Sequence, residues 1–270
     1  NFIKSFSNLL ICTCYSHKNK NYLEIAKKFE NFLTKFEKKK FINFKISNKK
    51  SLKVGFLSAD FRNHPVGYFL LDVIKNLKNK NIKLYAYSDH STVDETTKIL
   101  KKDFNNWLNV SKINDLDIIN LIRNDKIDIL VDLAGHTGNR LNVFKNRCSP
   151  KQITWCGWLA STGVKEIDYI IGDPYATPAN DQYKFVEKIY PLNKIWCCLS
   201  TSNLIPEIKI NKNNNNYITF GSFNRVSKIN DKVISIWSKI LKQIPKSKLV
   251  LKFNSYDKQY IRSNILKKFK

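Results

Sequence analysis

Two of the four histidines in the sequence lie in loops that directly follow strongly apolar segments. His64 follows the segment 54–58, and His136 follows the segment 127–133. A neutral imidazole can remove a proton from a hydroxyl group near neutral pH. Pro65 restricts the backbone of the residue before it, which would help to orient the His64 ring. From position alone, a general base and a histidine that caps its loop by hydrogen bonding are equally well supported.

A third residue that could do chemistry is Lys228. It follows an expected strand over 217–222 and a short loop, just before an expected helix over 231–243. A lysine near a helix N-terminus is well placed to contact a phosphate group. Because the chain holds 47 Lys and Arg residues, position alone does not distinguish Lys228 from the other lysines. Neither G-x-G-x-x-G after a strand nor G-x-x-x-x-G-K-[ST] occurs, which argues against a dinucleotide fingerprint and a P-loop.

The segment 155–163 is a further dense group of unusual residues, with two tryptophans close to two glycines. Aromatic rings beside glycines can form a stacking platform for a sugar or a base. A tryptophan on a strand is more often part of the core, and we favour that interpretation. The acids Asp168 and Asp173, with Glu187 further on, lie near the same strand ends. Their spacing does not resemble a metal site, so no metal is expected.

The six cysteines indicate a reducing compartment. None forms a C-x2-C pair with a matching partner motif, so a zinc site is poorly supported. Their irregular spacing is also unlike a secreted disulfide framework. We therefore expect reduced, mostly buried thiols and a cytoplasmic protein. The apolar segment 9–15 is too short to span a bilayer, so no membrane insertion is expected.

Three zones follow one another along the chain and would position these residues. Apolar residues at helical spacing predict a helical linker region over 1–50. Alternating strand and helix patterns predict a Rossmann-like, doubly wound α/β domain over 51–210. Ligands bind beyond the carboxyl ends of the strands in such sheets, which is where both loop histidines are expected. A polar tract at 211–216 is a plausible boundary. The two strand-helix units in 211–270 either complete the first sheet or begin a second domain.

The formal net charge of +25, on 270 residues, first suggests an anionic partner such as nucleic acid. The basic residues are nearly all lysine, however, and lie among abundant Asn and Ile, as biased codon usage produces. No nucleic-acid-binding motif is present, so we expect no nucleic-acid partner and mostly solvated lysines, including those at 38–40. Met is absent even at position 1, so the natural start is expected upstream.

Several motifs, taken together and in order, resemble the catalytic region of the protein O-GlcNAc transferase and SPINDLY-type family. They are GFLSADF at 55–61, NHP at 63–65, DILVDLAGHT at 128–137, RCSPKQI at 147–153, WCGW at 155–158, STG at 161–163, IDY at 167–169 and FNRVSKI at 223–229. The resemblance covers essentially the whole chain, and the number of motifs makes it specific.

The resemblance implies an inverting, metal-independent glycosyltransferase of the GT-B type, built from one Rossmann-like domain and the beginning of a second that faces it. Such an enzyme needs no cofactor and transfers a sugar, here most simply N-acetylglucosamine from UDP-GlcNAc, to Ser or Thr hydroxyls of acceptor proteins. It implies catalytic roles for His64 and His136, and donor binding by Lys228, Asn224 and Arg225. The residues matched to the cleft and acceptor side are Asp60, Asn63, Pro65, Gly135, Thr137, Gly157, Thr162 and Gly163.

Two features depart from the family pattern. Arg-Val-Ser at 225–227 stands where animal enzymes have Gln-Leu-Tyr beside the lysine, which leaves GDP-fucose and UDP-glucose open as donors. The Gly- and Thr-rich donor loop of the family does not occur before Lys270, so the second domain is expected to be truncated. Tetratricopeptide repeats usually lie upstream in the family, and no 34-residue repeat is visible here. A catalytically incomplete binding module is therefore the alternative interpretation.

Overall fold

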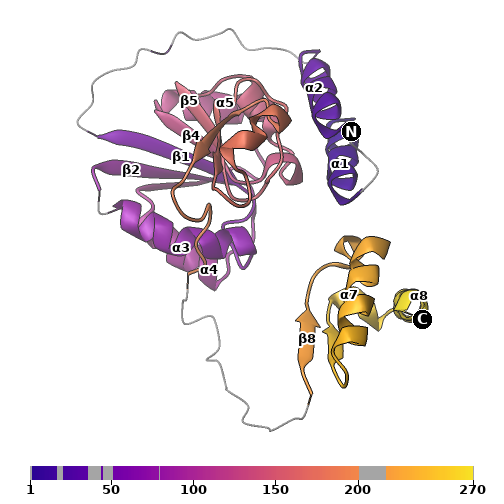
Figure 1. Ribbon diagram of the computed structural model, residues 1–270. Coiled ribbons are helices and arrows are strands. Elements are labelled where there is room, and N and C mark those ends of the chain that lie inside the picture. Colours follow the sequence, from indigo (N-terminus) through magenta and orange to yellow (C-terminus); the bar gives the residue numbers. More distant parts are fainter. Residues whose placement is uncertain are drawn as a thin grey trace. The chain divides into compact units, whose positions relative to one another are not determined.

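The computed structural model describes residues 2–16, 21–35, 44, 51–78, 80–200 and 217–269. The chain divides into two compact units, Asn1–Leu204 and Ile205–Lys270 (Figure 1). The expected division into 1–50, 51–210 and 211–270 stays a prediction. The lysines at 38–40 and the polar tract at 211–216 lie outside the described residues.

A seven-stranded sheet forms the centre of the first unit. Its strand order is β3-β2-β1-β4-β5-β6-β7, and every neighbouring pair is parallel. The unit contains α1 (Phe2–Tyr15), α2 (Tyr22–Leu33), β1 (Leu52–Ser58), α3 (Pro65–Lys78), β2 (Ile82–Ser88), α4 (Glu95–Asp103), β3 (Asn106–Asn109), α5 (Asp115–Asn124), β4 (Ile129–Asp132), the 3-10 helix η1 (Gly135–Thr137), α6 (Leu141–Lys145), β5 (Lys151–Thr154), β6 (Tyr169–Gly172), the 3-10 helix η2 (Ala179–Lys184) and β7 (Lys188–Pro191).

Alternation of side chains along the strands produces two separate apolar clusters, one on each face of the sheet. Phe56 of β1 belongs to the cluster that α3 and α4 complete, whereas Leu57 belongs to the cluster of α1, α2, α5 and α6. The sheet is therefore covered on both faces, as the continuous apolar strand patterns predict. The doubly wound α/β architecture expected from the sequence is confirmed.

The chain changes direction between β1 and β4. It runs outward from β1 through β2 to β3, then returns to place β4 on the opposite side of β1. The loops after β1 and β4 consequently lead to helices on opposite faces of the sheet, and in open α/β sheets this is the place where ligands bind. The switch point lies between the loops that carry His64 and His136.

Some element boundaries differ from those expected. The strand expected over 153–157 is β5, which ends at Thr154, because Cys156 has a left-handed backbone with φ of 78° that turns the chain away. The helix expected near Gly67 begins at Pro65, a residue whose fixed φ suits the first helical position. The short strand β7 and helix α6 have no clear pattern in the sequence.

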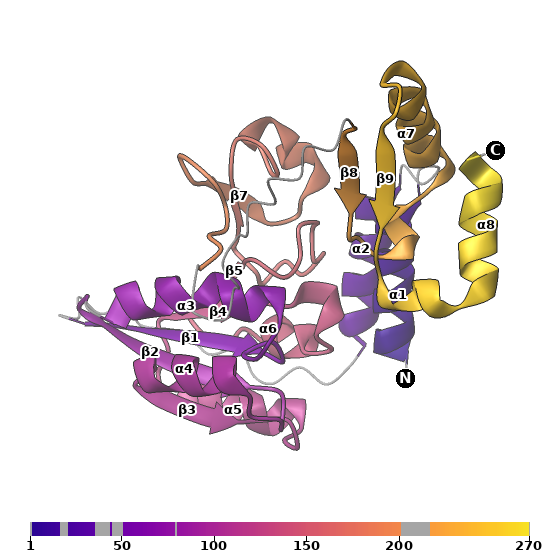
Figure 2. The same cartoon turned by 90° about the horizontal axis from the view of Figure 1, so that it is seen from below.

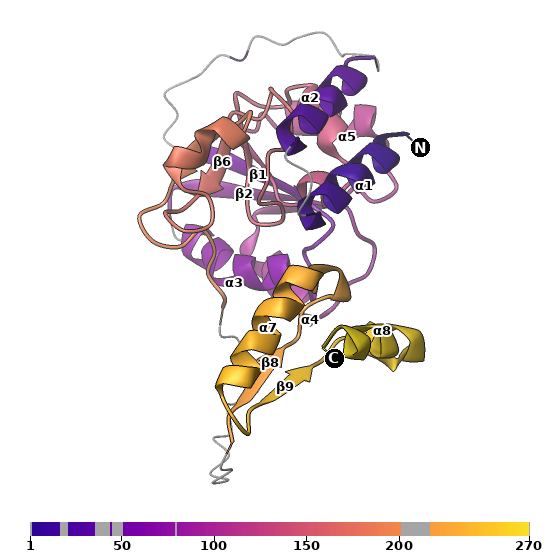
Figure 3. The same ribbon diagram turned by 45° about the vertical axis from the view of Figure 1, so that its right-hand side comes forward.

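Helices α1 and α2 pack against the rest of the first unit (Figure 3). Phe29 and Leu33 of α2 and Leu10 of α1 are buried in the same cluster as α5 and α6. The buried side chains follow helical spacing, as expected for amphipathic helices. Among the described residues, no helix is both long and apolar enough to span a membrane.

The second unit contains β8 (Thr219–Ser222), the 3-10 helix η3 (Val226–Lys228), α7 (Asp231–Gln243), β9 (Lys248–Leu251), the 3-10 helix η4 (Asn254–Asp257) and α8 (Gln259–Phe269). Strands β8 and β9 pair in parallel with each other, beside α7 (Figure 2). Of the two possibilities left open by the sequence, completion of the first sheet is therefore wrong for these strands.

The cysteines are free, but they are not mostly buried. Cys148 and Cys156 are buried, Cys197 is half-buried, and Cys12, Cys14 and Cys198 are exposed. The expectation of mostly buried thiols is wrong because Cys12 and Cys14 lie on either side of the buried Thr13 of α1 and are exposed, as is Cys198.

Candidate functional site

The loop after β1 places His64 at the carboxyl edge of the sheet, beside the switch point. The imidazole is half-buried, and its Nδ1 accepts a hydrogen bond from the Val66 N–H at 3.3 Å. The same nitrogen lies 3.6 Å from Oδ1 of Asp60, whose side chain is only 13% exposed. The Arg62 guanidinium lies 3.6 Å from that same oxygen. The structure thus brings together the predicted site residues Asp60 and His64.

This geometry offers His64 two tautomers. When Nδ1 accepts from Val66, the neutral ring carries its proton on Nε2. When Nδ1 carries the proton and turns toward Asp60, the lone pair of Nε2 becomes available to accept a proton. A carboxylate that orients an imidazole in this way is the common arrangement for a general base. The local geometry therefore fits acid–base chemistry at Nε2.

The neighbouring predicted residues Asn63 and Pro65 are exposed, while Gly67 in the first turn of α3 is buried. A Cβ at Gly67 would lie 2.2 Å from the backbone oxygen of Arg62, so no other residue fits without moving the loop. Pro65 begins α3 immediately after His64. The helix start thus fixes the end of the His64 loop.

On the other side of the switch point, Asp132 shapes the loop after β4. Its carboxylate accepts hydrogen bonds from the N–H groups of Ala134 and Gly135, each at 3.0 Å, and from the Thr154 hydroxyl at 2.8 Å. Burial raises the pKa of this carboxyl, and these donors act in the opposite direction. Asp132 is not among the site residues predicted from the sequence, although an acid that ends an apolar strand is a recognisable signal.

His136 lies in η1 but is 2% exposed, unlike His64. Its Nε2 is 2.9 Å from the backbone oxygen of Thr162, which can only accept, so Nε2 carries the proton. Nδ1 then accepts from the Ser7 hydroxyl of α1 at 3.1 Å. The ring also makes edge contacts with Phe29 and Trp158. The catalytic role of His136 stays a prediction; the geometry is that of a ring that ties α1 and α2 to the sheet.

Because burial lowers the pKa of His136 to about 4, folding should become less favourable in mild acid. The unfolded chain takes up this proton below pH 6.5, whereas the folded chain does so only near pH 4. The stability of the first unit should therefore fall as the pH decreases between these values, by about 2 kcal/mol from pH 7 to pH 5. Urea unfolding at pH 7 and at pH 5 measures this change in the free energy of unfolding. His136→Gln should remove most of this difference, and an unchanged pH dependence in that variant would refute the explanation.

Three predicted glycines allow close approach of backbone segments. A Cβ at Gly157 would lie 1.9 Å from the Leu133 oxygen, and one at Gly163 would lie 2.3 Å from the Ala26 oxygen of α2. Gly135 has φ of +52°, and its Cβ would lie 2.4 Å from Trp158. These contacts explain the glycines by packing. Trp158 itself is 8% exposed, in agreement with the core interpretation.

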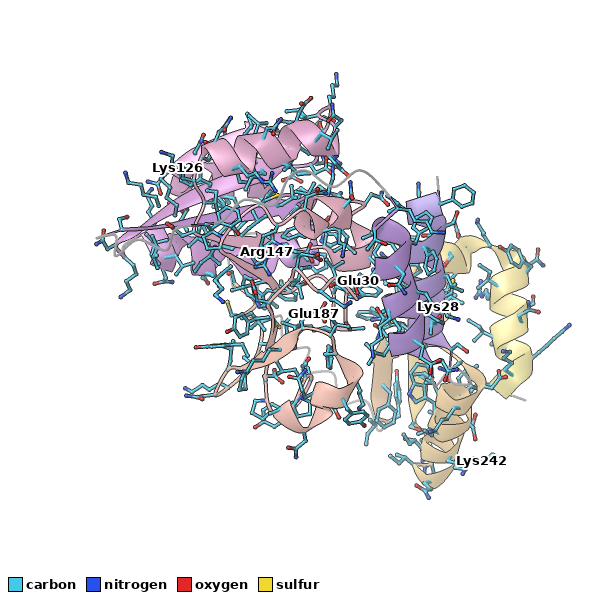
Figure 4. The ribbon with its side chains drawn as sticks, turned by 90° about the horizontal axis from the view of Figure 1, so that it is seen from above. Lys28, Glu30, Lys126, Arg147, Glu187 and Lys242 are labelled. Atoms are coloured by element: carbon cyan, nitrogen blue, oxygen red, sulfur yellow. The ribbon has the colours of Figure 1, made fainter. Side chains whose placement is uncertain are left out.

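The loop 161–163 is held by Glu187, which lies just before β7 and is 1% exposed. Its carboxylate accepts from the Ser161 hydroxyl at 2.7 Å, from the Thr162 N–H at 2.7 Å, and from the Thr162 hydroxyl. Burial raises the pKa of Glu187, and the three donors partly offset this effect. Figure 4 labels this residue. The backbone oxygen of Thr162 in turn accepts from Nε2 of His136, whereas the hydroxyl of the exposed Thr137 donates to the Ala134 oxygen at 2.6 Å.

The predicted donor-binding residues Asn224, Arg225 and Lys228 share one loop of the second unit, after β8, and all three are exposed. Lys228 ends η3, and α7 begins at Asp231. The side chain of Asn230 caps α7 by accepting from the Val233 N–H at 3.0 Å. Lys228 therefore lies in the loop before α7, and Asn230, not Lys228, caps the N-terminus of this helix. Among the described residues, no three His, Cys, Asp or Glu side chains gather as a metal site.

The sequence model of glycosyl transferase family 41 matches residues 24–214. The chain belongs to glycosyl transferase family 41. The probable UDP-N-acetylglucosamine--peptide N-acetylglucosaminyltransferase SPINDLY of Oryza sativa is 36% identical over 222 residues, which are 80% of this chain and 24% of that protein. The SPINDLY protein of Arabidopsis thaliana is 35% identical over the same shares. This family 41 chain thus spans about a quarter of the length of these plant relatives.

A solved structure extends the likeness to the fold of the family 41 chain. A lysine-to-methionine variant of the Thermobaculum terrenum O-GlcNAc transferase matches with a TM-score of 0.91 and 27% identity. The match covers 100% of this chain and 52% of that one. The resemblance noted in the sequence and the expected GT-B class are both confirmed.

Proposed function

We propose that the protein containing this chain transfers N-acetylglucosamine from UDP-N-acetylglucosamine to Ser or Thr hydroxyls of acceptor proteins. The observation that carries the proposal is the placement of His64 and Asp60, 3.6 Å apart, at the switch point of a family 41 sheet. The names of the plant relatives, which state this donor and a peptide acceptor, support the same substrates. A cytoplasmic location and upstream tetratricopeptide repeats complete the proposal.

In this reaction His64 accepts the proton of the acceptor hydroxyl on Nε2, while Asp60 holds the Nδ1–H side of the ring. The freed hydroxyl oxygen forms a bond to the anomeric carbon as the bond from that carbon to the diphosphate breaks. UDP leaves with the electron pair, and His64 then returns the proton to solvent. General bases in such positions contribute typically about 10²–10⁴-fold to the rate.

The second unit contributes positive charge to the donor in this proposal. Lys228 and Arg225 lie three residues apart in one exposed loop after β8. A leaving diphosphate gains negative charge in the transition state, and fixed cations stabilise it there. No metal is required in this scheme.

A donor comparison tests the proposal directly. The protein at its full gene-encoded length would be given UDP-N-acetylglucosamine, UDP-glucose or GDP-fucose with an acceptor protein, and transfer would be followed by mass spectrometry. We expect transfer of N-acetylglucosamine to Ser or Thr, and weaker or no transfer from the other donors. Transfer of fucose or glucose alone would contradict the donor assignment. Absence of transfer from all three donors would favour a binding module.

A further inference from the structure

The loop that carries His64 is fastened to the first turn of α4, which holds none of the predicted site residues. The backbone N–H of Asn63 donates to Oδ2 of Asp94 at 2.6 Å. The Thr96 hydroxyl donates to the side-chain oxygen of Asn63, also at 2.6 Å. The backbone N–H and the side-chain oxygen of the residue before His64 are thus held at the start of α4, which packs beside α3 (Figure 1).

The two carboxylate oxygens of Asp94 have different tasks. Oδ1 accepts the Thr97 N–H at 3.0 Å and so caps α4, whereas Oδ2 accepts from the loop residue Asn63. Burial raises the pKa of Asp94, but the donors from Asn63 and Thr97 outweigh it, so the pKa lies below its ordinary value. Asp94 is therefore charged at neutral pH, and a charged acceptor makes the stronger kind of hydrogen bond.

The first turn of α4 is itself rigid. Thr96 is 0% exposed and Thr97 is 3% exposed. The Thr97 hydroxyl donates to the Phe61 oxygen at 2.8 Å, a third bond from this turn to the same loop. From the other side, a Cβ at Gly67 would lie 3.2 Å from Thr96 and 2.2 Å from the Arg62 oxygen. The starts of α3 and α4 therefore hold residues 61–63 between them.

We propose that Asp94 and Thr96 are positioning residues for His64, because they fix Asn63 and thereby the direction in which the next side chain leaves the backbone. The purpose of this placement rests on the proposed function, in which the His64 ring must meet both Asp60 and an acceptor hydroxyl. Neither residue touches the reacting atoms. A small displacement of a catalytic group, of about 1 Å, is enough to cost on the order of 100-fold in rate.

Two substitutions separate this role from the capping of α4. In Asp94→Asn, the side-chain oxygen still caps the helix, since Asn and Asp are comparable caps. The side-chain NH2 group now faces the Asn63 N–H, and because both groups are donors, this hydrogen bond is lost. In Thr96→Val, the shape of the buried side chain is kept and only the hydroxyl bond to Asn63 is lost. Glu95→Gln is the matched control, because it removes one charge from the same turn, and the Glu95 carboxylate pairs with Lys98 on the surface instead.

Two kinds of measurement decide the matter. In the 270-residue chain, NMR would follow amide hydrogen exchange at Asn63 and the titration of the His64 ring. We expect exchange at Asn63 about 10-fold faster in Asp94→Asn and Thr96→Val than in Glu95→Gln, with a displaced His64 titration. In the full-length protein, kcat should fall about 10-fold in both variants, while KM for the donor stays close to that of the control.

The proposal is overturned if both variants match Glu95→Gln in Asn63 exchange and His64 titration. It is equally overturned if the NMR signals change but kcat does not. Thr96→Val leaves the Asp94 cap of α4 unchanged. If Asp94→Asn fails to fold, Thr96→Val alone therefore tests the proposal. If the wild-type protein shows no transfer at all, the proposed function fails, and the NMR comparison alone then supports or rejects the positioning of His64.

Discussion

Replacing Lys145 by Met is expected to destabilise the first unit by about 3–5 kcal/mol, the typical cost of removing one partner of a buried ion pair. The Lys145 ammonium lies 3.0 Å from Glu30 of α2 and 3.1 Å from Glu166. The side chains of Lys145 and Glu30 are each 4% exposed, so the substitution leaves a buried carboxylate that, in the part of the chain that the structure describes, keeps only the exposed Lys165, at 3.3 Å, for charge compensation. Figure 4 shows Glu30 where α2 meets the rest of the unit.

Urea unfolding followed by circular dichroism measures this loss, and faster hydrogen exchange in α2 should accompany it. Lys184→Met is the matched control, since it breaks the exposed pair with Asp181, at 2.8 Å, and should cost no more than about 1 kcal/mol. Adding Glu30→Leu to Lys145→Met should recover part of the lost stability, because no unpaired carboxylate then remains at position 30. Equal losses for the Lys145 and Lys184 variants would show that burial of the pair has no energetic consequence.

Replacing His64 by Ala in the full-length protein is expected to lower the transfer rate by about 10²–10⁴-fold. The physical reason is that the acceptor hydroxyl loses the group that takes its proton, while the positive loop after β8 is unchanged. KM for the donor should stay nearly constant, because His64 acts on the acceptor hydroxyl. Transfer to an acceptor protein at varied donor concentration gives both constants.

His90→Ala provides a closely matched control. His90 follows β2, and its Nδ1 accepts the N–H of the second residue along, Thr92, at 3.0 Å, which is the same local arrangement as His64 with Val66. Among the described residues, His90 forms no ion pair with a carboxylate, whereas His64 lies 3.6 Å from Asp60. A rate loss of similar size in both variants would remove His64 from the proposed base role.

Local patterns in the sequence were enough to predict the central strands of the sheet and most of the helices that cover it. The segments 54–58 and 127–133 are mostly apolar, which suits strands buried on both faces, and they lie within or across β1 and β4. Strand β7 could not be predicted this way. Only Ile189 in it is buried, and the strand exists because β6 offers its edge for pairing. The strand is specified by its pairing with β6 and not by a pattern in its own residues.

For the candidate site, too, some features could be predicted from local sequence and others could not. The motifs around His64 and Lys228 identified the family and the loops, because those motifs are continuous in sequence. His64 and His136 look alike locally, each in a loop after an apolar strand, yet one is half-buried and the other is 2% exposed. The difference comes from Ser7 and Phe29, which reach His136 from α1 and α2.

By itself, the sequence determined the family, the α/β class and the loops at the carboxyl edge, since each of these depends on contiguous motifs or on the periodicity of neighbouring residues. Only the tertiary structure decided which polar residues are buried in the fold and which are left accessible at the carboxyl edge of the sheet. Glu30 and Lys145 are 115 positions apart, and Asn63 and Asp94 are 31 apart. Such pairs form only when packing brings elements together that are distant in the sequence.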